Sequence, residues 1–122
     1  MFSSEYFEFQ KKFPFKSRTT EVSFVRQKYP DRIPIICEKS KSISKSYPDL
    51  DKSKYLVPYD LTVGQFIYVI RKRMKLDPAK SIFLCNKGKI LKVSDCISFL
   101  YEELKDDDGF LYLNYIGENV FG

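Results

Sequence analysis

The chain has 122 residues, a length typical of one compact domain, and its 43% hydrophobic and 16% aromatic content excludes wholesale disorder. No apolar run approaches the ~20 residues that cross a bilayer, and the N-terminus lacks the regions of a secretory signal, so we expect a soluble cytosolic protein. The formal net charge is +5, yet residues 11 to 54 alone hold twelve Lys or Arg against five Asp or Glu. A basic surface of this kind attracts acidic peptides, anionic lipid or nucleic acid without distinguishing among them.

Catalysis and metal binding are disfavoured by the residue types present. The chain has no histidine, the commonest general base and metal ligand, and no Gly-rich phosphate loop or hydrolase motif. Its three cysteines, Cys37, Cys85 and Cys96, are odd in number and widely spaced, so we interpret them as small buried hydrophobic residues rather than disulfides, ligands or reactive thiols. We therefore predict no catalytic residue, no metal and no cofactor.

Two helices are predicted before the first strand. Four aromatic residues recur at spacings of four, three and four and so lie on one helix face, which Pro14 ends: Phe2, Tyr6, Phe9 and Phe13. We expect this face to pack on the main domain; contact with a membrane after C-terminal anchoring is the alternative. A second helix is predicted over 17–28, ending before Tyr29-Pro30.

Residues 32–38 are rich in β-branched side chains and predict a strand. Because Pro34 cannot donate to a ladder, we expect this strand to lie at an open edge of the sheet, through Ile33, Ile35 and Cys37. A serine- and lysine-rich loop follows over 39–53, and a second strand is predicted over 54–58.

The second half of the chain alternates helices and strands. Thr62 and Gln65 fit a capping box, which predicts a helix with Val63, Phe66, Ile67, Ile70 and Met74 on its buried stripe. A buried-type strand over 81–85, a turn over 86–88 and a short strand over 89–92 come next. Ser94 is predicted to cap a helix with Ile97, Leu100, Tyr101 and Leu104 facing the core, before a last strand over 110–115.

This order of elements, strand, strand, helix, strand, short strand, helix, strand, is that of the ubiquitin-like β-grasp. We therefore predict an α+β protein with three parts: an N-terminal helical appendage over 1–28, a β-grasp domain over 29–116 and a flexible tail over 117–122. The tail ends at Gly122, and a residue without Cβ can enter a narrow enzyme channel, which suits chemistry on its carboxyl group. A terminal glycine also arises by chance, so this interpretation depends on the rest of the chain.

Several separated segments resemble the autophagy ubiquitin-like modifiers, the family of the GABA-receptor-associated protein and the microtubule-associated light chains. They are 29–36 (YPDRIPII), 51–58 (DKSKYLVP), 60–66 (DLTVGQF), 108–112 (DGFLY) and 117–122 (GENVFG), and the similarity covers roughly residues 15 to 122. The chain departs from the family after Cys85, where Asn86-Lys87-Gly88 stands in place of a paired asparagine and a proline pair, and in residues 1–14.

The resemblance implies that the chain is a substrate and not an enzyme. Gly122 would be activated by an ATP-using E1-like enzyme, passed through E1-like and E2-like thioesters, and amide-linked to phosphatidylethanolamine on autophagosomal membranes. A dedicated cysteine protease would remove it. The protein would then be cytoplasmic when free, and on the autophagosome membrane or in the lytic compartment when lipidated.

The resemblance also implies docking of receptor peptides of the form aromatic-x-x-aliphatic, which would add a strand to the 33–37 edge. Arg32, Lys52 and Lys54 would attract the acidic residues that precede such motifs. By correspondence with the family, the aromatic pocket comprises Glu21, Val25, Pro34, Ile36, Lys54, Leu56 and Phe110. The aliphatic pocket comprises Tyr55, Val57, Pro58, Leu61, Phe66, Val69 and Arg73.

Two other classes of function stay open at this point. An adaptor of the same fold that binds peptides but is never conjugated would make the glycine tail incidental. The basic charge is the one feature that favours a nucleic-acid or membrane-surface module. The aromatic residues sit at core spacing and do not alternate with the basic cluster, as base stacking would require. We expect no nucleic acid among the partners.

Overall fold

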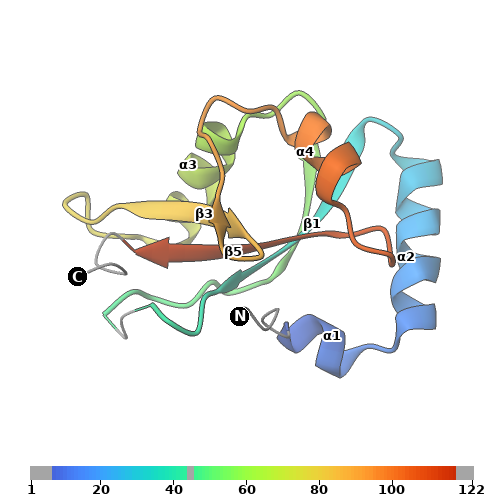
Figure 1. Ribbon diagram of the computed structural model, residues 1–122, viewed down its shortest axis with the longest axis horizontal. Helices are drawn as coiled ribbons and strands as arrows, with labels where there is room; N and C mark the ends of the chain where they lie inside the picture. Colours follow the sequence, from blue (N-terminus) through green and yellow to red (C-terminus); the bar gives the residue numbers. More distant parts are fainter. Residues whose placement is uncertain (1–6, 44–45, 118–122) are drawn as a thin grey trace.

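The computed structural model describes residues 7–43 and 46–117, and within them the chain forms four helices and five strands (Figure 1). In chain order these are α1 (Glu8–Lys12), α2 (Phe15–Lys28), β1 (Arg32–Lys39), β2 (Lys54–Pro58), α3 (Val63–Met74), β3 (Ile82–Asn86), β4 (Lys89–Ile90), α4 (Ile97–Leu104) and β5 (Leu111–Gly117). The predicted order of elements and the α+β β-grasp class are confirmed.

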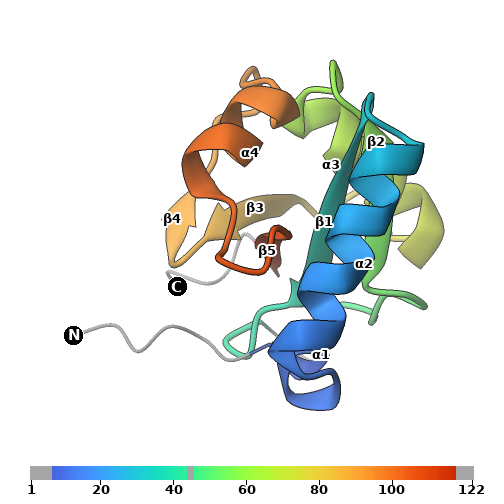
Figure 2. The same ribbon diagram turned by 90° about the vertical axis from the view of Figure 1, so that its right-hand side faces the viewer.

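One mixed sheet has the strand order β2-β1-β5-β3-β4, in which β1 and β5 run parallel and the other neighbours antiparallel. Helices α3 and α4 lie on one face of this sheet, and α1 and α2 lie against the other (Figures 1 and 2). Both faces of β1 are therefore covered, which suits its nearly continuous run of apolar side chains.

The prediction that β1 forms the open edge is wrong. Strand β1 lies between β2 and β5, and the edge on this side of the sheet is β2. The Cys37 amide donates to the Ser53 carbonyl at 2.8 Å. Because successive amides of a strand point to opposite sides, the Ile35 and Ile33 amides point toward β2 and the Pro34 nitrogen points toward β5. Pairing with β5 begins only at Ile35. Pro34 is tolerated because its nitrogen, which has no hydrogen to donate, faces the β5 side of β1 at a position before the pairing with β5 begins.

Local signals placed α3 correctly and α4 two residues too early. The capping box is present, with the Thr62 amide 2.9 Å from Gln65 Oε1 and the Gln65 amide 3.1 Å from Thr62 Oγ1. Helix α4 instead begins after Cys96, so the prediction of a Ser94 cap is wrong. Residues 93–95 instead form a turn, in which the Asp95 amide donates to the Lys92 carbonyl at 3.1 Å, and the Val93 and Asp95 carbonyls accept from the first amides of α3.

The main core lies between the sheet and α3 and α4. Its fully buried members come from the predicted helix stripes and from alternate residues of the strands: Ile35, Cys37, Val63, Phe66, Ile70, Leu84, Ile97, Leu111, Leu113 and Tyr115. A second, smaller cluster on the opposite face of the sheet joins α1 and α2 to it: Phe7, Phe9, Val22, Ile36, Phe110 and Tyr112. The domain is thus built on two apolar layers, one on each face of β1 and β5.

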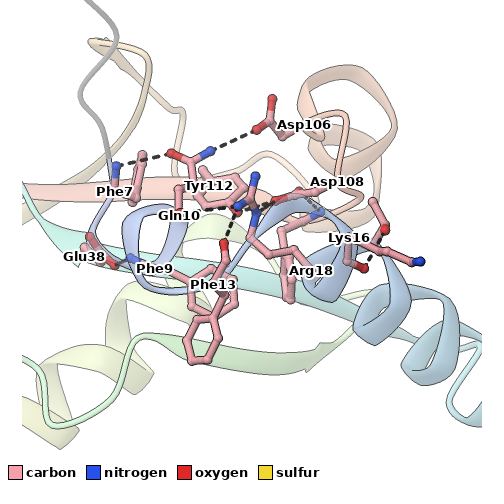
Figure 3. Close-up of polar contacts among 12 residues, drawn as sticks. Phe7, Phe9, Gln10, Phe13, Lys16, Arg18, Glu38, Asp106, Asp108 and Tyr112 are labelled. Atoms are coloured by element: carbon pink, nitrogen blue, oxygen red, sulfur yellow. Dashed lines mark hydrogen bonds and ion pairs between the residues drawn. The ribbon is translucent and has the colours of Figure 1, made fainter.

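Helix α1 is docked on the sheet as the packing interpretation predicts (Figure 3). The Phe9 ring is buried and meets the Phe110 ring edge-on at 5.2 Å between centroids. The two Glu38 carboxylate oxygens accept from the amides of Glu8 and Phe9 at 2.9 and 3.0 Å. A buried Phe9 does not belong to an exposed membrane-contacting face; Phe13 is 40% exposed, and Phe2 and Tyr6 lie outside the described residues.

A buried carboxylate joins α2 to the start of β5. The Asp108 side chain is inaccessible to solvent, accepts from Arg18 Nε at 2.7 Å and from the Phe110 amide at 2.9 Å, and also accepts from the Tyr112 hydroxyl. Burial, followed by the bond to Asp108, raises the pKa of Tyr112. The Arg18 guanidinium also donates to the Phe13 carbonyl at 2.5 Å (Figure 3). This network fixes both N-terminal helices to the domain.

We predict that Asp108→Asn lowers the free energy of unfolding by about 3–5 kcal/mol, because it replaces the buried carboxylate that pairs with Arg18 by a neutral amide. Urea unfolding followed by circular dichroism measures the change. The matched control is Asp107→Asn at the exposed neighbouring position, for which we expect a change within about 0.5 kcal/mol. Equal stabilities for the two variants would contradict the role assigned to Asp108.

Candidate functional site

The outer side of β2 presents backbone groups that the sheet leaves unpaired. Because Cys37 pairs with Ser53 by a hydrogen bond, the amides of Tyr55 and Val57 also point toward β1, and the amide of Leu56 points away. In the described residues no further strand pairs with this side of β2. The Leu56 carbonyl lies 3.5 Å from Arg32 Nη1, a long contact. This edge is the place where an extended peptide can add a strand.

The residues expected to form the aromatic pocket lie on the α2 side of this edge. Glu21 on α2 and Lys54 on β2 form an ion pair that joins the two elements. Leu56 is half-buried beside Lys54 on the same face of β2, opposite Pro34 of β1, and Val25 is half-buried one turn after Glu21. The structure therefore brings the sequence-predicted set to one region between α2 and the β1–β2 pair.

Two members of this set form its floor and are almost completely buried. Ile36 and Phe110 are 0% and 1% exposed, and both belong to the cluster that Phe9 and Val22 complete. The Lys54 ammonium lies 5.9 Å from the centroid of the Phe9 ring. Phe9 is thus a wall of this region that is absent from the predicted pocket, because the resemblance does not reach residues 1–14. The helical spacing of the aromatic residues was the available signal.

Among the residues expected to form the aliphatic pocket, Tyr55 and Val57 lie on the opposite face of β2, toward α3, whereas Pro58 alternates to the face of Leu56. The Tyr55 and Phe66 rings meet edge-on at 5.4 Å between centroids and, with Val57, are buried in the main core. The accessible members of the set are Leu61, which is half-buried, Val69, which is 38% exposed, Pro58 and Arg73. Leu61 and Val69 line a groove of about 470 Å³ with Thr62, Gly64, Gln65, Tyr68 and Val93.

Charged side chains surround the start of the β2 edge. Arg73 on α3 donates to both carboxylate oxygens of Asp51 at 3.1 and 2.8 Å, and this hydrogen bonding holds the pKa of Asp51 below its usual value. The Lys52 ammonium lies 4.9 Å from the centroid of the Tyr55 ring, whose hydroxyl pKa burial raises to about 12. Lys52 and Lys54 thus lie at the start of the β2 edge, whereas Arg32 belongs to β1, lies opposite Pro58 at the other end of β2 and approaches the Leu56 carbonyl.

The cysteines differ from one another in accessibility. Cys37 and Cys85 are buried as predicted, and burial raises the pKa of the Cys37 thiol. The prediction is wrong for Cys96, which is partly exposed, and a hydrogen bond with the Ser98 hydroxyl lowers the pKa of its thiol. Across residues 7–43 and 46–117, no cluster of Cys, Asp or Glu has the arrangement of a metal site. None of the helices in these ranges has both the length and the apolar composition to cross a bilayer.

We predict that the Leu56 amide exchanges with deuterium on the order of 100-fold faster than the amides of Tyr55 and Val57, because only the last two donate to β1. Amide exchange followed by nuclear magnetic resonance measures all three in one sample. The two flanking amides are internal controls of strand stability, since fraying would expose the three together. Similar protection at all three positions would show that the outer side of β2 is covered.

Comparisons with known proteins found related sequences and a related solved structure. Residues 17–122 match the family described as "Autophagy protein Atg8 ubiquitin like". Autophagy-related protein 8d of Arabidopsis thaliana is 51% identical over 114 residues, covering 93% of each chain, and autophagy-related protein 8 of Mycosarcoma maydis is 54% identical, covering 93% of this chain and 95% of the relative. The crystal structure of Trypanosoma brucei ATG8 superposes with a TM-score of 0.89 at 41% identity, covering 97% of this chain and all of that chain. The chain belongs to the autophagy Atg8 family of ubiquitin-like proteins.

Proposed function

We propose that this protein is a ubiquitin-like modifier that is joined through Gly122 to phosphatidylethanolamine and that docks receptor peptides along β2. Membership of the autophagy family supports the first part. The open outer side of β2, with one predicted pocket on each face, supports the second and is the observation on which it rests. In this proposal the protein is the substrate of the conjugating enzymes and supplies no catalytic group.

The spacing of the proposed peptide motif fits the two faces of β2. Side chains of an extended peptide alternate between faces, so residues three apart point in opposite directions and lie roughly 10 Å apart. The aromatic residue would enter the side of Leu56 and Lys54, and the aliphatic residue the side of Leu61 and Val69. The peptide backbone would pair with the outward amide and carbonyl of Leu56. Acidic residues before the motif would meet Lys52 and Lys54, the latter exchanging its Glu21 partner.

The chemistry at the tail proceeds through activated carboxyl derivatives. The Gly122 carboxylate would attack ATP to give an acyl adenylate and pyrophosphate, and an E1-like cysteine thiolate would displace AMP to form a thioester. After transfer to an E2-like cysteine, the amine of phosphatidylethanolamine would attack the thioester carbonyl, so that an amide forms and the thiol leaves. The two acyl chains give the firm membrane attachment that a single chain does not. Gly122 lies outside the described residues.

The release of the protein from the lipid and its location in the cell follow from the same proposal. A cysteine protease of the conjugation system would hydrolyse the amide at Gly122 and release the protein. The free form would be cytoplasmic, and the lipidated form would lie on the autophagosome membrane and later in the lytic compartment.

We predict that Leu56→Ala weakens binding of an acidic aromatic-x-x-aliphatic peptide by about 10-fold or more, because it removes apolar contact beside the aromatic residue of the peptide. Isothermal titration calorimetry measures the dissociation constant. Ile90→Ala is the matched control, since Ile90 is an aliphatic residue on the other edge strand and is 41% exposed. Equal affinities for both variants would remove β2 as the docking edge.

We predict that the protein forms an ATP-dependent adduct with phosphatidylethanolamine in liposomes when E1-like and E2-like enzymes are added, and that Gly122→Ala abolishes it. The added methyl group crowds the channel through which the tail reaches the reacting cysteines. Gel shift and mass spectrometry detect the adduct and its position. If enzymes that are active on another modifier give no adduct with the wild type, while the peptide still binds, the protein is an unconjugated adaptor of the same fold.

A further inference from the structure

The loop between β1 and β2 is composed mainly of serine and lysine, yet it contains one almost completely buried aromatic residue. Tyr47 is 2% exposed and belongs to the main core cluster. Its hydroxyl donates to the Ser81 carbonyl at 3.0 Å, just before β3. A buried tyrosine whose hydroxyl has a partner is a fixed element of structure rather than a mobile loop residue.

Tyr47 lies directly against Gly117, the last residue of β5. A Cβ added to Gly117 would lie 2.6 Å from the Cε1 and Cζ atoms of the Tyr47 ring and 2.9 Å from its hydroxyl oxygen. No side chain larger than hydrogen fits there without moving the ring. Gly117 pairs with Ile82 of β3, so the ring covers the point at which the chain leaves the sheet.

Neighbouring contacts hold Tyr47 in this position. Lys39 Nζ donates to the Tyr47 carbonyl at 3.1 Å, and the Tyr115 hydroxyl donates to the Pro48 carbonyl at 2.8 Å. The Lys80 ammonium lies 5.2 Å from the centroid of the Tyr47 ring and donates to the Ser46 carbonyl at 3.2 Å. The loop after β1 and the end of β5 lie at the same end of the sheet (Figure 1). Tyr47 therefore joins the loop, the start of β3 and the end of β5.

We propose that Tyr47 is a positioning residue for conjugation at Gly122, an inference that rests on the proposed function. Five residues follow Gly117, and they span at most about 17 Å. With so short a tail, the position and direction of Gly117 decide how often the Gly122 carboxyl reaches a reacting group on an enzyme bound to the domain. Fixing the base of the tail raises the effective concentration of that carboxyl.

The experiment compares Tyr47→Ala, Tyr47→Phe and wild type in the reconstituted conjugation reaction, at a temperature where all three are folded. We expect adduct formation to slow about five-fold with Tyr47→Ala and to stay within about two-fold with Tyr47→Phe, which keeps the ring against Gly117. Tyr59→Ala, at a tyrosine that is 54% exposed, is the matched control and should equal wild type.

Two further readouts separate positioning from loss of structure. The order parameter of the Gly117 amide should fall in Tyr47→Ala, while the affinity for the receptor peptide stays at the wild-type value. Gly117→Ala alone should slow conjugation because its methyl group displaces the ring; added to Tyr47→Ala, it should cause no further loss.

The outcomes distinguish this inference from the proposed function. An active wild type with equal rates for Tyr47→Ala overturns the positioning role and leaves conjugation intact. An additive loss in the double variant also overturns it, because the effect of Gly117→Ala would then not depend on the ring. A wild type that forms no adduct with active enzymes overturns conjugation itself, and the positioning role with it.

Discussion

The parallel pairing of β1 with β5 determines where each functional part of this protein lies. It places β1 in the interior of the sheet, which leaves β2 as the edge on that side. It also brings the carboxyl ends of β1 and β5 to the same end of the sheet. The loop that leaves β1 therefore passes the last residue of β5, and Tyr47 can meet Gly117. One pairing thus accounts for both the open edge at β2, where we propose docking, and the position of Tyr47 against the base of the tail.

The N-terminal helices complete one of the two predicted pockets. Without these helices, Ile36 and Phe110 would be exposed on the face of the sheet that α1 and α2 cover. The cluster with Phe9 and Val22 buries both residues. The hydrogen-bond network around Arg18 and Asp108 holds these helices in place, because removing one member of a buried ion pair is strongly destabilising. The walls of the aromatic pocket on the α2 side therefore depend on a charge network at the start of β5.

Local sequence signals predicted the elements well, and long-range contacts decided what could not be predicted. The capping box at Thr62 involves residues three apart, so the sequence alone contains all its partners. Pro34 correctly signals a missing donor, but a missing donor does not imply a missing neighbouring strand, and β1 proved central. Ser94 has the right chemistry for a cap, yet it lies in a turn whose flanking carbonyls, of Val93 and Asp95, accept from the distant start of α3.

The residues of the candidate sites divide in the same way. The pocket residues were predicted from the resemblance over 15–122, and in the structure they lie around β2. Phe9 lies outside the resemblance and was indicated only by aromatic spacing, and Tyr47 lies in a loop that no motif marks. The proposed docking edge at β2 and the base of the tail at Gly117 lie in different parts of the sheet. Strand β2 pairs with the first part of β1, whereas Lys39, the last residue of β1, pairs with Tyr115, two residues before Gly117. A domain held to a membrane by a short tail beyond Gly117 would therefore still present β2 to a receptor peptide, so that anchoring and docking can operate together.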